Sequence, residues 1–277
     1  MLRAMNTSKS VGDRYVLATG EAGARRLELL DRIYGPETQR ILSKIGIPQA
    51  GRAADIACGT GSTTVWLAKE VGPEGEVVGL DVSADQIKVA AQRAATQGAT
   101  NIRFVEASAY DTGLARSAFD IVHCRLLLCH LMRPMEALRE MASLVRSGGT
   151  LICFDLDYPS LFSVPYSRCY ARISEIFMAT GASRGVDYAL GLKLPRLFQG
   201  CGFAEPEVEF IQPVRLRGEE KRMSAYTFLE AAPAMIESGI VSQQEVNALV
   251  AELEQVAQDE TVLVAQARMP VVWARRA

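Results

Sequence analysis

The chain has 277 residues, of which 49% are hydrophobic and 22% are charged, and its formal net charge is −2. This length and apolar content are enough for one elaborated α/β domain. The near balance of charges lacks the basic footprint of a nucleic-acid-binding protein, so we expect no nucleic-acid partner.

Neither a signal sequence nor a membrane span is predicted. The N-terminal segment MLRAMNTSKSVGDRY has no apolar run that could direct secretion. No stretch approaches the roughly 18 apolar residues that cross a bilayer. The six cysteines are spread out without a C-x-x-C pair, and the two histidines are His123 and His130. We therefore expect a cytoplasmic protein with reduced thiols, no membrane partner and no metal site.

The N-terminal region is predicted to be helical. From residue 21 to about residue 45, apolar residues recur at the spacing of a helix face. They are Leu27, Leu30, Ile33, Tyr34, Ile41 and Leu42. The pair Gly35-Pro36 interrupts this run, because proline cannot donate the backbone hydrogen bond of a helix interior. We therefore predict two helices, which form an N-terminal lid over residues 1–46.

Short apolar segments then alternate with helical ones. We predict strands over 53–57, 76–81, 102–106, 119–124 and 150–155, and helices over 63–70, 83–97 and 134–144. Ser83 is the predicted N-cap of the second of these helices. Strands separated by helices indicate a parallel sheet with helices on both faces, and their Val, Ile and Phe content suits burial on both sides. Residues 47–157 form the predicted core.

The pattern changes after residue 157. A proline-bearing loop at 158–165 precedes predicted helices over 166–179, 194–199, 221–238 and 242–258. Predicted strands over 207–214 and 269–275 form a pair that closes the edge of the sheet. We expect the helices between these strands to form a cap, so that residues 158–277 complete the sheet and cover it.

The segment from Ala53 to Gly61 carries the strongest functional pattern, because a strand ends there and the chain turns sharply into a helix. Gly59 and Gly61 let the backbone approach a ligand with no Cβ in the way. The amides at the helix start favour a carboxylate or another anion. Asp81 ends the next strand, about twenty residues further on, where a carboxylate can accept both hydroxyls of a ribose.

Two kinds of cofactor compete for this loop. An NAD-dependent oxidoreductase requires a third glycine or an alanine, but Thr64 stands at that position. Asp55 would repel a pyrophosphate, whereas it could orient the loop or bind an ammonium group through water. These features favour a zwitterionic sulfonium cofactor, and the oxidoreductase is the alternative.

At these residues the chain resembles the class I S-adenosylmethionine-dependent methyltransferases. The segment D-I-A-C-G-T-G-S resembles their first motif and G-L-D-V-S resembles their second. Segments 104–109, 119–122, 125–131 and 144–150 are similar to their later motifs. The resemblance covers about residues 50–157. It implies a Rossmann-like α/β fold with a seven-stranded, mostly parallel sheet whose last strand is antiparallel, and S-adenosylmethionine as methyl donor with S-adenosylhomocysteine as product.

The resemblance also implies roles for individual residues at the cofactor. The methionine part would be lined by Ala57, Gly59, Thr60, Gly61, Arg125 and Leu126 beside Asp55, and Tyr15 and Arg26 would cover the cofactor from the lid. Asp81 would hold the ribose hydroxyls, with Val82 and Gln86 beside the adenine. Ser108 stands where the family often has an aspartate that bonds the adenine amino group. A hydroxyl can also form that bond, and the amide of Ala109 offers a further contact.

Candidate catalytic residues follow the fourth and fifth predicted strands. His130 could be a general base for a hydroxyl or amine nucleophile, or it could cap a helix. Asp155 and Tyr158 lie at the carboxyl edge of the sheet, where ligands bind in open α/β sheets. Asp157 could contact the substrate as well, or simply organise the turn.

We expect methyl transfer to an O, N, C or S atom of a small molecule. Similar enzymes that act on planar nitrogens carry the tetrapeptide N-P-P-Y after the fourth strand, but Cys124-Arg125-Leu126-Leu127 stands there. A second alternative is a methyltransferase-like protein that binds the cofactor without methylating. The sequence leaves the oligomeric state open, a homodimer included.

Overall fold

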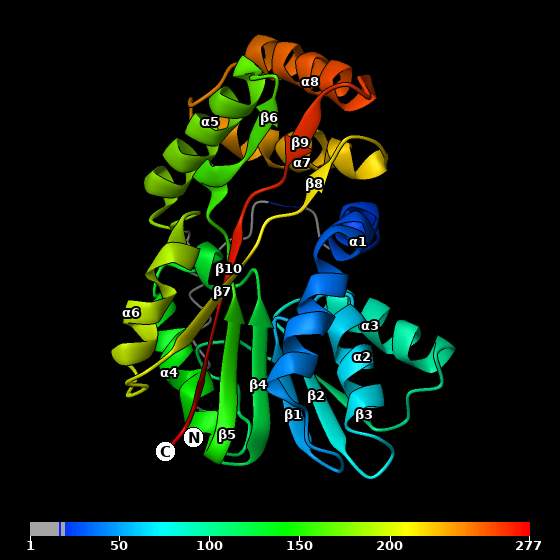
Figure 1. Cartoon of the computed structure of the whole chain (residues 1–277), viewed down its shortest axis with the longest axis vertical. Coiled ribbons are helices and arrows are strands. Elements are labelled where there is room, and N and C mark those ends of the chain that lie inside the picture. Colours follow the sequence, from blue (N-terminus) through cyan, green and yellow to red (C-terminus); the bar gives the residue numbers. More distant parts are fainter. Residues whose placement is uncertain (1–16, 18–19) are drawn as a thin grey trace, which may run out of the picture.

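The computed structural model describes residue 17 and residues 20–277, so the predicted lid residue Tyr15 lies outside the described part. Figure 1 shows a central sheet with helices packed against it and a further layer above the carboxyl ends of its strands. The first helix, α1 (Gly20–Ile45), runs from the level of that layer down beside the sheet.

Seven strands form the main sheet in the order β3-β2-β1-β4-β5-β10-β7. They are β1 (Arg52–Ile56), β2 (Glu76–Asp81), β3 (Ile102–Glu106), β4 (Phe119–Arg125), β5 (Val145–Phe154), β7 (Glu207–Ile211) and β10 (Met269–Arg275). Neighbours among the first five strands of this order are parallel, whereas β10 runs antiparallel to both β5 and β7. The predicted Rossmann-like sheet with an antiparallel last strand is confirmed.

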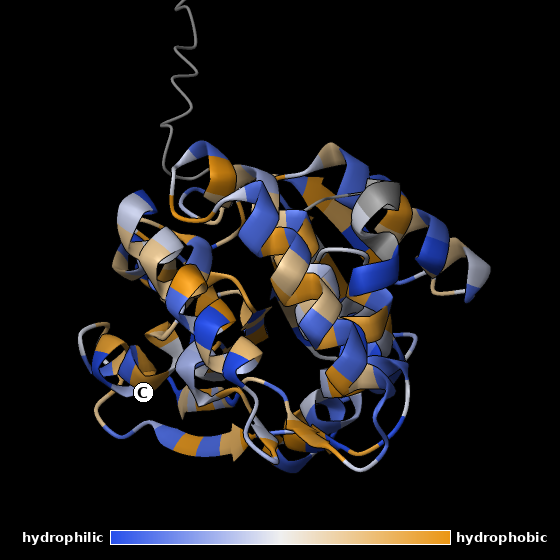
Figure 2. Ribbon diagram, turned by 90° about the horizontal axis from the view of Figure 1, so that it is seen from above, coloured by the Kyte–Doolittle hydropathy of each residue, from blue (hydrophilic) through white to orange (hydrophobic). Residues whose placement is uncertain are grey.

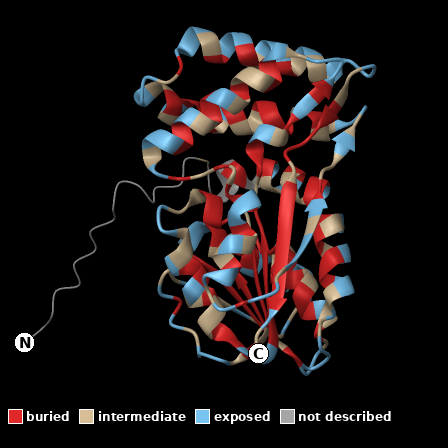
Figure 3. Cartoon of the chain, turned by 60° about the vertical axis from the view of Figure 1, so that its left-hand side comes forward, coloured by how far each residue is buried: buried red, intermediate tan, exposed pale blue. Residues whose placement is uncertain are grey.

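The central strands are buried on both faces, which Figure 3 shows as a stack of buried residues. Alternate residues enter two different cores: Ala53 and Val77 pack with α1 and α2 (Ser62–Glu70), and Ala54 and Val78 pack on the opposite face. The helices α4 (Pro134–Leu144) and α6 (Leu194–Gln199) share that opposite core. Helix α3 (Ala84–Thr96) contacts α1 and α2 and has Ser83 as its N-cap, as predicted.

The prediction of two N-terminal helices is wrong, because α1 continues through Pro36 as one helix. Leu29 and Ile33 before the proline, and Ile41 and Leu42 after it, are all buried in the same core. Burying four such side chains contributes about 6–12 kcal/mol in total. That exceeds the about 3 kcal/mol that an internal proline costs a helix. The continuous apolar face therefore overrides the break.

The layer above the sheet is the predicted cap. It contains α5 (Arg168–Arg184), α7 (Met223–Glu237) and α8 (Gln243–Gln258). Seen from above in Figure 2, the helices mix hydrophilic and hydrophobic residues. Phe228, Met235 and Leu249 are among the apolar cap residues that are buried. The cap is thus built from amphipathic helices that turn their apolar faces inward.

The sequence does not predict a second, three-stranded sheet in the cap. Its order is β6-β9-β8, formed by β6 (Phe162–Val164), β9 (Leu263–Ala265) and β8 (Val214–Arg215). The strand predicted over 207–214 is therefore divided between two sheets, because Pro213 cannot donate to a ladder and separates β7 from β8. The loop predicted at 158–165 contains β6.

Short 3-10 turns complete the chain: η2 (Leu128–His130), η3 (Tyr158–Ser160), η4 (Leu190–Lys193) and η5 (Glu219–Arg222). In the described part of the chain, no helix combines the length and the apolar character that crossing a bilayer requires.

Gly79 of β2 lies where no larger side chain fits. A Cβ there would lie 2.7 Å from the Phe104 ring on β3 and 3.0 Å from the Thr64 methyl group on α2. We expect Gly79→Ala to lower the free energy of unfolding by about 1–3 kcal/mol, because the core must shift to admit the methyl group. Urea unfolding followed by circular dichroism measures this change. An unchanged midpoint would contradict the tight packing around β2.

Candidate active site

A cavity of about 280 Å³ lies where the carboxyl ends of β1, β2 and β4 meet α1 and the cap. Parallel strands place their carboxyl ends at one edge of a sheet, and this brings residues far apart in the sequence together. The residues predicted from the sequence that line the cavity are Arg26, Asp55, Ala57, Gly59, Thr60, Asp81, Val82, Gln86, Arg125, Leu126, His130 and Tyr158.

The turn after β1 adopts backbone conformations that favour glycine. Gly59 has a φ of 54° and Gly61 a φ of 77°, and Ala57 has a φ of 59°. A Cβ on Gly59 would meet nothing within 4 Å, so the space above it is open. A Cβ on Gly61 would lie 2.8 Å from the Cβ of Ala90 on α3. Gly59 therefore faces open space, whereas Gly61 lets α2 approach α3.

Asp81, the last residue of β2, supports this turn from the side. Its Oδ2 accepts a hydrogen bond from the Gly59 N–H and its Oδ1 accepts one from the Ser83 N–H, each at 2.9 Å. Burial raises the pKa of Asp81, and the backbone hydrogen bonds oppose that shift. Each carboxylate oxygen keeps lone-pair capacity, so Asp81 can still accept hydrogen bonds from ligand hydroxyls.

Asp55 ties the turn to both of its flanking elements. Its Oδ2 accepts a hydrogen bond from Thr64 Oγ1 at 2.6 Å, and the Nδ1 of His123 lies 2.8 Å from its Oδ1. All three side chains are buried. The β1–β4 register sets Asp55 beside His123, which the sequence does not reveal without the strand order. Thr64, which distinguishes this loop from a dinucleotide loop, anchors the start of α2.

Arg125, the last residue of β4, connects the cavity to α1. Its Nη2 donates to Asp31 Oδ1 at 3.1 Å, and its Nη1 donates to Thr38 Oγ1 at 3.2 Å. Ser62 Oγ donates to the second oxygen of Asp31 at 2.6 Å. Asp31 and Ser62 also line the cavity and are absent from the predicted set. Asp31 sits on a helix with no motif, so nothing in its local sequence marks it.

Arg26 fastens α1 to the cap. Its side chain is 4% exposed, and its Nε donates to Glu230 Oε2 of α7 at 2.7 Å. On the surface, Arg25 and Arg32 both pair with Glu219. The lid residue Arg26 therefore reaches the cavity while it holds the cap and α1 together.

Three predicted cofactor residues, Gly61, Ser108 and Ala109, are not among the residues of the described chain that line the cavity. The hydroxyl of Ser108 accepts a hydrogen bond from the Tyr110 N–H at 3.2 Å, within a local turn. Gln86 is 5% exposed and lines the cavity, and its Oε1 has no hydrogen-bond partner within the described residues. Gln86 thus supplies the buried polar group next to Asp81.

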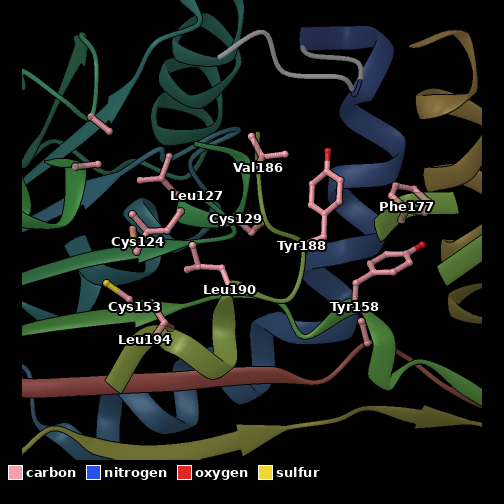
Figure 4. Packing of buried hydrophobic residues seen from close by; sticks show 14 of the residues in the cluster. Cys124, Leu127, Cys129, Cys153, Tyr158, Phe177, Val186, Tyr188, Leu190 and Leu194 are labelled. Carbon is pink, nitrogen blue, oxygen red and sulfur yellow. The ribbon is translucent and has the colours of Figure 1, made fainter. Parts of the chain in front are cut away.

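An aromatic wall made of Tyr158, Phe177, Tyr188 and His130 lines another part of the cavity. The ring centroids of Tyr158 and Phe177 lie 4.4 Å apart, those of Phe177 and Tyr188 lie 5.9 Å apart, and those of His130 and Tyr188 lie 5.5 Å apart. Figure 4 shows Tyr158, Phe177 and Tyr188 grouped together. The sequence predicts two of its four members as candidate catalytic residues.

The two predicted catalytic groups on this wall are uncharged near neutral pH. Burial, together with the nearby cations Arg26 and Arg184, lowers the pKa of His130 to about 3. Burial raises the pKa of the Tyr158 hydroxyl well above its usual value. The aromatic wall is therefore electrically neutral.

Asp155, the third predicted catalytic residue, is not among the lining residues of the described chain. Its Oδ2 accepts a hydrogen bond from the Cys129 N–H at 3.0 Å, and its Oδ1 accepts one from the Leu156 N–H at 2.9 Å. Burial raises the pKa of Asp155 to about 6. Asp155 therefore organises the backbone behind the cavity. Asp157 likewise pairs with Arg268 at 2.6 Å.

Comparison with known proteins identifies the family to which the chain belongs. Residues 49–175 match a family model described as a methyltransferase domain. A demethylmenaquinone methyltransferase of Staphylococcus carnosus is 30% identical over 183 residues, which cover 62% of this chain and 75% of that protein. A candidate methyltransferase of Bacillus halodurans has a solved structure with a TM-score of 0.58 at 18% identity, covering 92% of this chain and 99% of that one.

A second similar solved structure contains bound S-adenosylhomocysteine. The phosphoethanolamine N-methyltransferase 2 of Haemonchus contortus, in complex with S-adenosylhomocysteine, has a TM-score of 0.53 at 16% identity. The match covers 93% of this chain and 53% of that one. The chain belongs to the S-adenosylmethionine-dependent methyltransferases, and S-adenosylmethionine is its cofactor. The NAD-dependent oxidoreductase alternative is set aside.

Asp81→Ala removes the carboxylate that faces the cavity beside the glycine turn. We expect the dissociation constant for S-adenosylhomocysteine to rise about tenfold to hundredfold, because hydrogen bonds to a charged group are lost. Isothermal titration calorimetry measures this change. Asp85→Ala is the matched control, since Asp85 is exposed on the first turn of α3 and does not line the cavity. Equal affinities for both variants would contradict the site assignment.

Acid should destabilise the fold through His130. The unfolded chain takes up a proton near pH 6.5, whereas folded His130 does so only near pH 3. Between these values the unfolded state binds more protons, so stability falls as the pH falls. Between pH 7 and pH 4.5, the free energy of unfolding should fall by roughly 1 kcal/mol less in His130→Gln than in the parent protein. The effect is no larger because solvent screens a half-buried group.

Urea unfolding of both proteins at the two pH values checks this sign. Asp155 acts in the opposite direction, since its pKa is raised to about 6 and protonation below that value favours the folded state. The comparison of variant with parent cancels that contribution. A larger acid loss in His130→Gln than in the parent would reverse the assigned direction of the His130 pKa.

Proposed function

We propose that this enzyme methylates a small, uncharged acceptor that contains an aromatic ring, at a carbon or oxygen atom. The observation that carries the proposal is the neutral aromatic wall of Tyr158, Phe177, Tyr188 and His130 in the cavity. Aromatic rings bind other rings through offset or edge-to-face contacts, which add to the burial of apolar surface. A flat acceptor can therefore be held and oriented without an ion pair.

The charge of the surroundings supports the same class of acceptor. Leu131, Leu156 and Leu161 line the cavity together with the aromatic wall. The acidic residues that lie close in sequence to the wall have other partners. Asp155 turns its oxygens to backbone N–H groups, Asp157 pairs with Arg268, and Asp187 pairs with Lys193. A cationic amine at this wall would lose hydration without gaining a partner of opposite charge. An uncharged hydroxylated ring meets no such penalty.

The sequence relatives support a ring acceptor. The Staphylococcus carnosus protein is named a demethylmenaquinone methyltransferase, and a quinone nucleus is a ring of the proposed kind. The acceptor is thus a small molecule, as expected from the sequence. Of the four expected kinds of methylated atom, O, N, C and S, we propose carbon or oxygen.

We assign the polar part of the cavity to the cofactor. Asp81 accepts the ribose hydroxyls, Gln86 accepts a donor at the adenine end, and Arg125 with Asp31 borders the methionine end. Two features support this fit: the open space above Gly59 and the buried Oε1 of Gln86, which has no partner within the described residues. A ligand with several donors and one carboxylate complements these groups.

The bound cofactor supplies a methyl group on a sulfonium, which is already activated for direct displacement. The chain then has to align the acceptor and exclude water. The acceptor gains the methyl group and releases one proton. His130 can accept a hydrogen bond from an acceptor hydroxyl, but a pKa of about 3 prevents it from retaining the proton at neutral pH. His130 therefore orients the nucleophile, and the proton passes to solvent.

Phe177→Leu tests the aromatic wall with little change in volume. We expect kcat/KM for hydroxylated naphthalenes to fall about twofold to tenfold, because ring contacts are worth about 0.5–1.5 kcal/mol. Transfer of a labelled methyl group, followed by mass spectrometry, measures the rate. Phe210→Leu is the matched control, since Phe210 is an exposed phenylalanine on β7 outside the cavity.

The acceptor panel should also contain primary amines and thiols. Turnover of amines in preference to hydroxylated rings would contradict the proposed acceptor class. Binding of S-adenosylmethionine with no methylated product from any member of the panel would favour the non-methylating alternative.

A further inference from the structure

A buried acid–imidazole pair lies beneath the polar part of the cavity. Asp55 and His123 are register partners on β1 and β4, and their Oδ1 and Nδ1 atoms lie 2.8 Å apart. Each residue is 1% exposed, and both line the cavity. The cofactor assignment above does not use His123, and nothing in the family resemblance assigns a role to it.

The hydrogen bonds around Asp55 fix the proton of the imidazole. A carboxylate only accepts, so the Nδ1 of His123 is the donor to Oδ1, while Thr64 Oγ1 donates to Oδ2 at 2.6 Å. The Nε2 of His123 then carries a lone pair on the far side of the ring from Asp55. This atom is buried and has no hydrogen-bond partner within the described residues. A buried acceptor of this kind requires a donor.

Two donors that line the same cavity have protein partners of their own. The hydroxyl of Tyr34 donates to the Ala267 carbonyl at 2.7 Å. The guanidinium of Arg125 donates to Asp31 and Thr38. The ring packed against His123 is Phe154, with centroids 5.4 Å apart, and it offers no polar atom. A ligand in the cavity that His123 lines can supply the donor that Nε2 lacks among the described residues.

We propose that His123 Nε2 accepts a hydrogen bond from the α-ammonium group of the cofactor's methionine part, with Asp55 as the counter-charge behind the imidazole. The cofactor offers three kinds of donor: the ammonium, the ribose hydroxyls and the adenine amino group. The ribose acceptor Asp81 ends β2 and the adenine acceptor Gln86 is on α3, whereas His123 is on β4 close to Arg125. The ammonium is the remaining donor.

Charge favours the same assignment. The carboxylate of Asp55 lies out of water, where its attraction for a cation is strong. Arg125 lies two residues further along the same strand and presents the opposite charge. The ammonium and the carboxylate of one amino acid thus meet charges of opposite sign. This arrangement recognises both charged groups of the methionine part and fixes its orientation in the cavity.

Imidazole ¹⁵N NMR on the unmodified protein tests the proposal directly. The chain has two histidines, so labelled histidine gives four ring resonances, and His130→Gln identifies which belong to His123. We expect free His123 to carry its proton on Nδ1. Saturation with S-adenosylhomocysteine should shift its Nε2 resonance, and the desamino analogue, which lacks the ammonium, should leave it in place. Equal shifts with both ligands, or a proton on Nε2, would overturn the assignment.

Calorimetry with the same two ligands gives the second readout. We expect His123→Phe to weaken S-adenosylhomocysteine about tenfold to hundredfold, the usual loss for a hydrogen bond to a charged group. The affinity of the desamino analogue should change less than about twofold, because it makes no such bond. A decarboxylated analogue keeps the ammonium and should show the full loss. Equal losses for all three ligands would mean that His123 is purely structural.

Asp55→Asn adds an arm that does not alter the imidazole ring itself. It removes the counter-charge and should weaken S-adenosylhomocysteine more than the desamino analogue. These experiments need no methyl acceptor, so their outcome is independent of the proposed acceptor class. The NMR comparison also decides the matter if His123→Phe does not fold.

Discussion

The hydrogen bond between Asp55 and Thr64 is the interaction on which the site depends. Asp55 precedes the glycine turn and Thr64 follows it, so their 2.6 Å hydrogen bond joins the two ends of the turn. Between these ends, Ala57 and Gly59 adopt positive φ values, which a turn without this bond would not hold. Asp81 then fixes the turn from β2 by accepting from the Gly59 N–H. Two carboxylates thus shape this part of the cavity surface.

Around this turn the cavity divides into a charged part and a neutral part. The charged part contains Arg125 and Asp31, which also dock α1 onto the sheet edge. The neutral part is the aromatic wall, whose titratable members Tyr158 and His130 are held uncharged by burial. A charged region and an uncharged region therefore line one cavity. The separation follows from the fold, since α1 and β4 supply Asp31 and Arg125, while the segments after β4 and β5 and the region of α5 supply the aromatic rings.

The sequence predicts what depends on local pattern. The alternation of strands and helices, the turn at Gly59 and the acid at Asp81 all depend on short segments, and the structure has each of them where expected. Features that depend on distant packing escape prediction. Pro36 lies inside one helix because the core on both sides of it is continuous, and Asp31 becomes a cavity residue only once α1 docks. Sequence pattern alone contains neither fact.

The chemistry of the family explains why so few titratable groups face the acceptor. A methyl group on a sulfonium needs no further activation, so a charged side chain at the acceptor would mainly add a cost of desolvation. The structure meets this condition by turning Asp155 toward the Cys129 and Leu156 N–H groups, out of the cavity lining. The same carboxylate holds the backbone after β4 in register with β5, which positions His130. An acid whose place after the fifth predicted strand suggests a catalytic role thus contributes by shaping a neutral pocket.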